Sequence, residues 1–157
     1  MKKAHLLPLL LFILITACNT KEPSPAPTAN ELIKGKWTST SIMRKYYDES
    51  GTLIHQKVED SGWYYDFDGI KYSISVPPVK GQQPATYTEA FSGKYTVEQV
   101  NGKDYYSFVE NGVTVEISDI SEARMTWLQI SSIRTYYQGG TEMTADSAVQ
   151  ITMFARR

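Results

Sequence analysis

The sequence has one cysteine, Cys18, among its 157 residues. A disulfide needs a second cysteine, and a structural zinc site normally needs three or four ligands, so this residue supports neither kind of cross-link. Net charge is also small, at −1, and no basic stripe interrupts the even scatter of charges. Nucleic-acid binding depends on cations that neutralise phosphates, so we expect no nucleic acid among the partners.

The N-terminus lacks an apolar run long enough to cross a bilayer. Its apolar stretch, Leu6 to Ile15, falls well short of the roughly 20 residues that a spanning helix needs. Lys2 and Lys3 precede the stretch and the small residue Ala17 follows it. This order of charged, apolar and small residues predicts a cleaved secretory leader over residues 1–17.

The four residues Ile15-Thr16-Ala17-Cys18 resemble the bacterial lipoprotein box. The resemblance implies cleavage before Cys18, a diacylglycerol on its sulfur and an N-acyl chain such as palmitate on its new amino group. Two acyl chains give a stable membrane anchor, whereas one is marginal. Asn19 follows where inner-membrane retention prefers aspartate, so the resemblance implies the outer membrane of a Gram-negative cell envelope.

Residues 18–30 follow as the lipidated cysteine and a tether. Three prolines alternate with small polar residues in this segment, which keeps a chain extended and unable to pair in a sheet. The remaining residues, 31–157, suffice for one domain with its own core. A hydrophobic content of 41 % is too high for a disordered protein, so we expect this segment to fold.

Helical periodicity is nearly absent after Glu31, and two-residue alternation dominates. In "IKYSISV", Ile70, Tyr72, Ile74 and Val76 share one face, as a half-buried strand requires. "FSGKYTVE" and "VTVEIS" repeat the alternation. The pattern predicts strands near 36–47, 52–58, 62–68, 70–76, 86–98, 104–110, 113–118, 124–137 and 147–155, with a short helical turn at 31–34.

Glycine-containing turns separate these runs. Asn111-Gly112 predicts a type I′ hairpin, which needs positive φ at both residues. Further reversals are expected at Ser50-Gly51, Asp68-Gly69, Asn101-Gly102 and Gly139-Gly140. Strands at regular spacing with tight turns indicate an all-β antiparallel sandwich or barrel.

Gly35-Lys36-Trp37, at the start of the first strand, resembles the Gly-x-Trp signature of the lipocalins, and the later strands resemble the lipocalin-like domains of bacterial lipoproteins. The resemblance implies an eight-stranded antiparallel up-and-down barrel, a calycin-type fold, with Trp37 closing its bottom. It also implies an arginine from the last strand lying across that tryptophan, for which Arg156 is the candidate. The alternative is that Arg156 and Arg157 form a solvated tail.

No set of residues for catalysis stands out. His55 is the one histidine after the leader, and no Gly-x-Ser-x-Gly elbow is present to expose a serine. The residues Asp66-Phe67-Asp68-Gly69 begin like a calcium loop but lack its later ligands, so a hairpin turn explains them better. We expect no enzyme activity, no metal and no cofactor beyond the acyl chains, and a surface position for His55.

Four Tyr-Tyr pairs each place one ring on either face of a strand. Inward rings can line a pocket or simply stabilise the sheet through cross-strand pairs. Our leading hypothesis is a non-catalytic binder of a small apolar or amphipathic molecule; its expected wall residues are Tyr72, Ile74, Phe91, Tyr95, Val97 and Val115. The alternative is an envelope protein-interaction module, an inhibitor or assembly subunit, with a filled core.

Asp146-Ser147-Ala148 resembles a glycosylation site of exported proteins, which makes Ser147 a candidate acceptor.

Overall fold

The computed structural model describes residues 25–78 and 86–157. The predicted signal peptide, 1–17, and Cys18, the predicted site of lipid attachment, lie outside these residues. Within the two described ranges, no helix is both long and apolar enough to cross a membrane.

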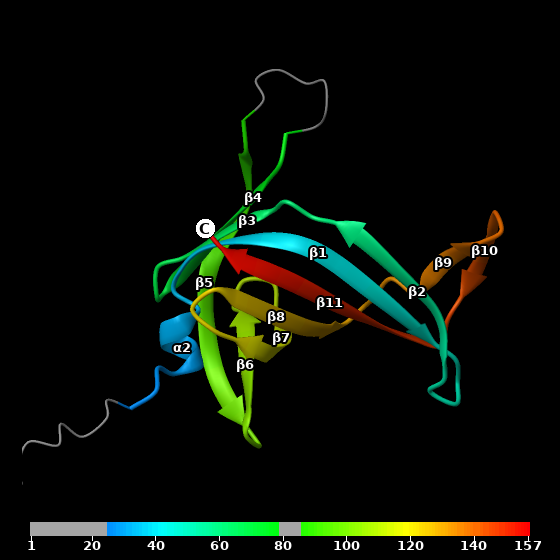
Figure 1. Ribbon diagram of the computed structural model, residues 1–157, viewed down its shortest axis with the longest axis horizontal. Coiled ribbons are helices and arrows are strands. Elements are labelled where there is room, and N and C mark those ends of the chain that lie inside the picture. Colours follow the sequence, from blue (N-terminus) through cyan, green and yellow to red (C-terminus); the bar gives the residue numbers. More distant parts are fainter. Residues whose placement is uncertain (1–24, 79–85) are drawn as a thin grey trace, which may run out of the picture.

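The chain folds into a closed antiparallel β-barrel of eight strands (Figure 1). The alternation predicted a sandwich or a barrel, and the lipocalin resemblance predicted the eight-stranded barrel. The described elements are α2 (Ala29–Leu32), β1 (Gly35–Tyr47), β2 (Leu53–Asp60), β3 (Tyr64–Phe67), β4 (Lys71–Val76), β5 (Thr88–Val100), β6 (Lys103–Phe108), β7 (Val113–Ile120), β8 (Arg124–Ile130), β9 (Thr135–Gln138), β10 (Thr141–Thr144) and β11 (Ser147–Arg156). The order around the barrel is β1-β3-β4-β5-β6-β7-β8-β11, and β11 pairs with β1 to close it.

Strand β1 is longer than the barrel wall needs, and it serves two partners along one edge. Residues 35–38 pair with β3, whereas residues 41–47 pair with β2. Strand β2 therefore lies outside the ring of eight. Together with the far part of β1 and β11 it forms an extension of the sheet, and the β9–β10 hairpin lies beside this extension (Figure 1).

One end of the barrel, called here the closed end, holds α2, the start of β1 and the end of β11. Thr28 caps α2 and forms a reciprocal capping box with Glu31, so the helix begins inside the predicted tether. Ile33 and Trp37 are fully buried, and Trp37 Nε1 donates a 2.7 Å hydrogen bond to the Ile33 carbonyl. The opposite end, called the open end, holds the turn over residues 109–112 and the last residue of β8.

Aromatic side chains fill most of the barrel interior. They pack mainly edge to face, with ring centroids about 4.5–6 Å apart, an arrangement that favours aromatic pairs beyond simple area burial. The buried rings are Trp37, Phe67, Tyr72, Tyr95, Tyr106, Phe108, Trp127 and Phe154. A second, smaller core lies under the extension and consists of Tyr46, Tyr136, Ala145 and Ala148.

Three sequence predictions were wrong in detail. The expected strand 124–137 ends at Ile130, because Ser131 Oγ accepts the Ile133 N–H and turns the chain into the β9–β10 hairpin. Asn111 does not adopt positive φ; the turn spans four residues, and Asn111 Oδ1 instead accepts the Val113 N–H. His55 is half-buried rather than a plain surface residue, because its ring stacks on Tyr136 at 4.5 Å.

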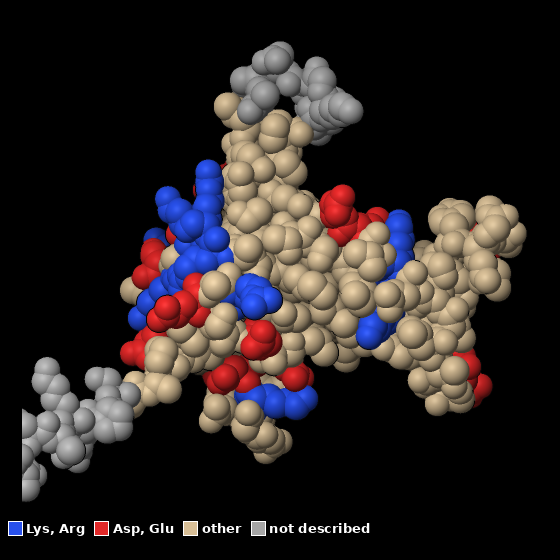
Figure 2. Space-filling model, viewed as in Figure 1, with Lys and Arg blue, Asp and Glu red and all other residues tan. Residues whose placement is uncertain are grey.

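Charged side chains are distributed unevenly over the molecule. Figure 2 shows Lys and Arg gathered at the end that holds the C-terminus, bordered by Asp and Glu, while few charges interrupt the middle of the visible face. The Tyr-Tyr pairs show the expected division: Tyr136 is 6 % exposed and its neighbour Tyr137 is 67 % exposed.

Candidate ligand-binding site

The open end of the barrel contains a pocket of about 180 Å³ that opens to solvent. It lies between the inner faces of β3 to β8 and β11 and is reached past two half-exposed rings, Trp63 and Phe91. The lining residues are Trp63, Tyr65, Ile74, Phe91, Phe108, Asn111, Val113, Val115, Trp127, Gln129, Gln150 and Thr152. None of these residues, as far as the structure describes the chain, carries a formal charge.

The polarity of the pocket follows from alternation along two neighbouring strands. On β11 the inward positions run from Phe154 through Thr152 to Gln150 as the strand approaches the open end, and on β8 Trp127 is followed inward by Gln129. Apolar side chains therefore occupy the depth of the barrel, and amide and hydroxyl groups occupy its mouth. A molecule entering this mouth would place an apolar part inside and a polar part outside.

Trp127 supplies a hydrogen-bond donor that nothing in the described part of the chain satisfies. The residue is 5 % exposed, lines the pocket, and its indole Nε1 has no hydrogen-bond partner among the described residues. A buried donor without a partner costs free energy, so such groups are uncommon in native interiors. Because Trp127 lines the pocket, a bound molecule that placed an acceptor beside this nitrogen would supply the missing hydrogen bond.

Backbone contacts fix the rim of the pocket. Trp63 lies in the irregular segment between β2 and β3, where its N–H donates to Ser39 Oγ at 3.1 Å and its carbonyl accepts the Ser39 N–H at 3.0 Å. Ser39 also contacts Ser61 Oγ at 2.5 Å. This position coincides with the irregularity in the β1–β11 register between Ser39 and Ser41. The bulge thus holds the Trp63 backbone against the barrel wall.

An ion-pair network borders the polar side of the mouth. Arg44 Nε donates to Gln150 Oε1 at 3.1 Å, and Arg44 Nη1 lies 2.5 Å from Glu59 Oε2. Lys57 Nζ lies 2.8 Å from the other Glu59 oxygen, and this hydrogen bond, followed by the attraction of Arg44, lowers the pKa of Glu59. The network orients the Gln150 amide toward the pocket's edge.

The structure places the six predicted wall residues in two groups. Ile74, Phe91 and Val115 line the pocket. Tyr72 and Tyr95 instead pack deeper among the aromatic rings, and Val97 is half-buried against the same core. Desolvation is the main cause that raises the pKa of both Tyr72 and Tyr95, which keeps these hydroxyls neutral.

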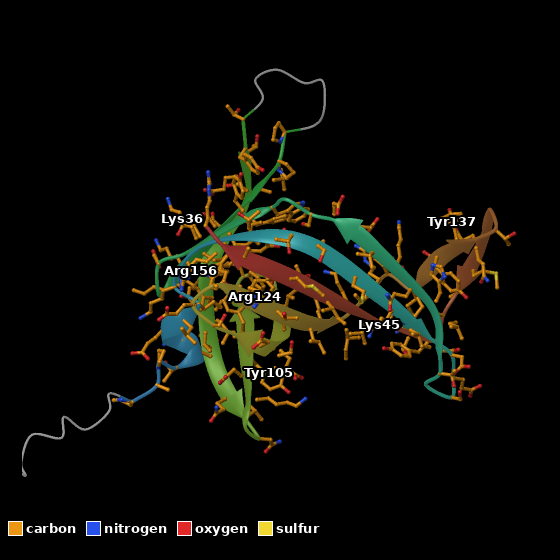
Figure 3. The ribbon with its side chains drawn as sticks, in the orientation of Figure 1. Lys36, Lys45, Tyr105, Arg124, Tyr137 and Arg156 are labelled. Atoms are coloured by element: carbon orange, nitrogen blue, oxygen red, sulfur yellow. The ribbon has the colours of Figure 1, made fainter. Side chains whose placement is uncertain are left out.

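The other candidates from the sequence lie away from this pocket. The guanidinium carbon of Arg156 lies 4.5 Å from the centre of the Trp37 ring at the closed end, and its nitrogens donate to the carbonyls of Leu32, Lys34 and Glu122 (Figure 3). Asp68 accepts the N–H groups of Ile70 and Lys71 in a hairpin turn, as its sequence context indicated. Ser147 is exposed at the start of β11.

Sequence reasoning missed most of the aromatic lining of the pocket. Tyr65 could have been found as one ring of a Tyr-Tyr pair, and Trp127 sits on an alternating run. Trp63 alternates with Tyr65 and Phe67 within the predicted strand 62–68, which is the signal that could have found it. In comparisons with known proteins, neither a family model nor a curated protein matches this chain.

Proposed function

We propose that this protein is a lipid-anchored envelope lipoprotein, held at the outer membrane through Cys18, that binds a small apolar or amphipathic molecule at the open end of its barrel without transforming it. One observation carries the binding proposal: an aromatic pocket opens at the barrel mouth, and one of its lining residues, Trp127, has a buried indole N–H with no partner among the described residues.

The size of the pocket limits the part of a ligand that enters. A dry apolar cavity of roughly 150 Å³ accommodates a benzene ring, whereas sites for drug-sized molecules span about 300–1,000 Å³. The pocket of about 180 Å³ therefore suits one ring or a short alkyl end. Any remaining polar part of the molecule would lie against Gln129 and Gln150 at the mouth, with Phe91 covering one side.

The chemistry of the lining favours binding over catalysis. The side chains at the pocket are rings, aliphatic groups, amides and the hydroxyls of Thr152 and Tyr65, which supply shape and hydrogen bonds. Burial raises the pKa of Tyr65, so this phenol stays protonated. General acid–base catalysis needs a titratable group beside the reacting atom. The nearest ionisable network, Arg44 with Glu59, is held in ion pairs at the border of the mouth.

A matched pair of ligands tests the role of Trp127. Acetophenone has a carbonyl acceptor, and α-methylstyrene has nearly the same shape without one. We expect calorimetry to show that Trp127→Phe lowers the affinity for acetophenone by about 1 kcal/mol more than that for α-methylstyrene. Equal losses for both compounds would mean that the indole contributes its ring alone.

A second pair of variants tests the location of the site. Phe91 and Val100 are both about half exposed on β5, but only Phe91 lines the pocket, because Val100 is at the closed end. Phe91→Ala should weaken binding of both compounds several-fold, and Val100→Ala should leave it unchanged. Binding that survives Phe91→Ala at full strength would place the ligand elsewhere.

The alternative, a protein-interaction module, is favoured by a different observation. A row of apolar side chains crosses the outer face of the extension, where Val58 opposes Met43, Met43 opposes Ile151, and Ile151 opposes Leu128. Ile130 beside this row is 83 % exposed. A protein partner that protects this row from solvent, combined with failure of both test compounds to bind, would favour the alternative.

A further inference from the structure

The closed end carries five cations on one continuous surface. Lys36 on β1, Lys71 on β4 and Lys94 on β5 project outward, and Arg157 follows β11. Lys34 completes the set, since its side chain lies beside Gly69 in the β3–β4 turn. These five residues are called the basic surface below; all are exposed. Lys and Arg are visible at this end in Figure 2.

Like charges meet on this surface. Lys71 and Lys94 are direct cross-strand partners, an arrangement that costs stability in an antiparallel sheet. Lys36 lies 3.8 Å from Asp66, and that is the one ion pair found for the five cations among the described residues. Two further carboxylates lie close by, and backbone N–H groups engage both: Asp68 accepts from the turn, and Glu110 accepts the Lys94 N–H at 2.7 Å. Five cations with three carboxylates beside them leave a surplus of positive charge on the surface.

The groups between the cations suit a phosphate. A shallow pocket of about 150 Å³ on the outer face joins Lys36 and Arg157 to the hydroxyl-bearing residues Ser73, Ser75 and Tyr64. Asp66 also lines this pocket, where Lys36 lies 3.8 Å from its carboxylate. Arg157 is held there, because its N–H donates to the Lys36 carbonyl at 2.9 Å and its guanidinium lies 4.3 Å from the Tyr64 ring centre. Tyr64 in turn stacks on Tyr87 at 3.7 Å.

An apolar side chain projects at the same place. Ile70, at the tip of the β3–β4 turn, is 66 % exposed and is followed directly by Lys71. Cations around an exposed aliphatic group, with tyrosines at the border, are the composition that lies at a lipid–water interface.

The chain enters the domain at this end. Helix α2 and the described residues before it lie at the closed end (Figure 1). Nine residues lie between Cys18 and Thr28, so the two Cα atoms are ten residue steps apart and at most about 36 Å from each other. A lipid on Cys18 would therefore keep the closed end near the membrane.

From these observations we infer that the basic surface docks on the anionic lipid headgroups of the membrane that holds the anchor, with Ile70 entering the headgroup layer and lipid phosphates contacting Lys36, Lys71, Lys94 and Arg157. This inference rests on the proposed lipid anchor. Docking would direct the open end and its pocket away from the bilayer.

The test uses the mature protein inserted through its own anchor into vesicles. A single added cysteine carries a fluorophore, and headgroup-labelled lipids act as quenchers. The cysteine is either Ser92→Cys, on the same outer face as Lys94, or Ser50→Cys, in the exposed turn between β1 and β2 at the far end of the extension. The wild-type protein, without an added cysteine, is the control for the anchor. It reacts with the fluorophore only if the Cys18 sulfur carries no lipid, so labelling of the wild-type protein would refute the proposed anchor rather than the docking.

We expect quenching at Ser92→Cys in vesicles containing phosphatidylglycerol and little quenching in pure phosphatidylcholine. High salt, which shortens the Debye length to about 3 Å, should abolish the difference. A cation near an anionic surface contributes about fivefold to an equilibrium. Lys71→Glu with Lys94→Glu should therefore lower the docked-to-free ratio at least about 25-fold, whereas Lys45→Glu with Lys57→Glu on the extension should not.

Equal quenching in both lipid compositions would overturn the inference, as would stronger quenching at Ser50→Cys than at Ser92→Cys. The comparison of lipids and the salt series need no charge variant, so they decide the question even if the double variant fails to fold. Addition of free inorganic phosphate separates a phosphate site from a membrane surface: relief of quenching by millimolar phosphate at constant ionic strength would assign the surface to the free anion.

Discussion

Removing one hydroxyl from the middle of the barrel should make the protein more stable. Tyr106 is fully buried, and its hydroxyl has no hydrogen-bond partner among the described residues. Its ring packs against Phe108 at 4.5 Å, Tyr95 at 5.0 Å and Trp127 at 5.4 Å. Burial raises the pKa of Tyr106, so the hydroxyl stays neutral and its cost is that of a buried, unsatisfied donor.

Tyr106→Phe keeps the ring and its contacts while it removes the orphan group. An unsatisfied buried polar group costs about 1–3 kcal/mol, and we expect the variant to recover about 1–2 kcal/mol of unfolding free energy. For a domain of this size that corresponds to a rise in Tm of roughly 3–8 °C. Urea unfolding and calorimetry would measure both quantities.

Tyr137→Phe is the matched control. Tyr137 is 67 % exposed, and its hydroxyl donates to Glu142 at 2.7 Å on the surface of the β9–β10 hairpin (Figure 3). Loss of this exposed contact should change stability by less than about 0.5 kcal/mol. If Tyr106→Phe instead destabilised the protein by 1 kcal/mol or more, the hydroxyl would have a bonding partner, and the reasoning from an unsatisfied group would be refuted.

Three further predictions address the closed end, a turn and the small core. Gly35→Ala should lower the free energy of unfolding by at least about 1 kcal/mol more than Gly51→Ala does, because both glycines have positive φ but only a Cβ at Gly35 would meet the Arg156 guanidinium, at 2.7 Å. Equal losses in urea unfolding would contradict this close approach. Backbone N–H groups lower the pKa of Asp68 below its ordinary 3.8, so the ionised carboxylate stabilises the fold above that pH, and this stabilisation is lost as the pH falls through the lowered pKa. Asp68→Asn should therefore reduce the loss of stability at acid pH, and an unchanged acid limb of the stability-versus-pH curve would exclude this contribution. Tyr136→Ala should speed hydrogen exchange in β9 and β10 while the barrel amides stay protected, since Tyr136 stacks within the small core; faster exchange throughout the barrel would show that the two cores are not independent.

Local sequence patterns predicted most of the strands because each signal depends on a few neighbouring residues. Alternation such as Tyr72-x-Ile74 and Val115-x-Ile117 placed the correct face inward, and those four side chains are all buried. Glycine turns were also visible, as in Asn101-Gly102, where both residues adopt positive φ. The ring closure by β1 and β11 came from the family resemblance, since alternation alone does not distinguish a barrel from a sandwich.

The features that sequence reasoning missed depend on contacts between distant segments. The alternation of β2 does not reveal that it pairs only with the far half of β1 and stays outside the ring. Nothing local separates Ile74, which reaches the pocket, from Tyr72, which packs in the core, because both face inward on one strand. The break at Ser131 is a side-chain hydrogen bond within an otherwise regular apolar pattern.

The central claim is that the pocket lined by Trp127, with its unpartnered N–H, binds a small molecule. Native mass spectrometry of the mature protein, purified from its own envelope, tests this claim most directly. We expect a polypeptide that begins at Cys18 and carries acyl chains. We also expect a small bound molecule that organic extraction removes and that the Phe91→Ala variant retains poorly. A protein without such a molecule, which also binds neither acetophenone nor α-methylstyrene, would contradict the proposed binding function.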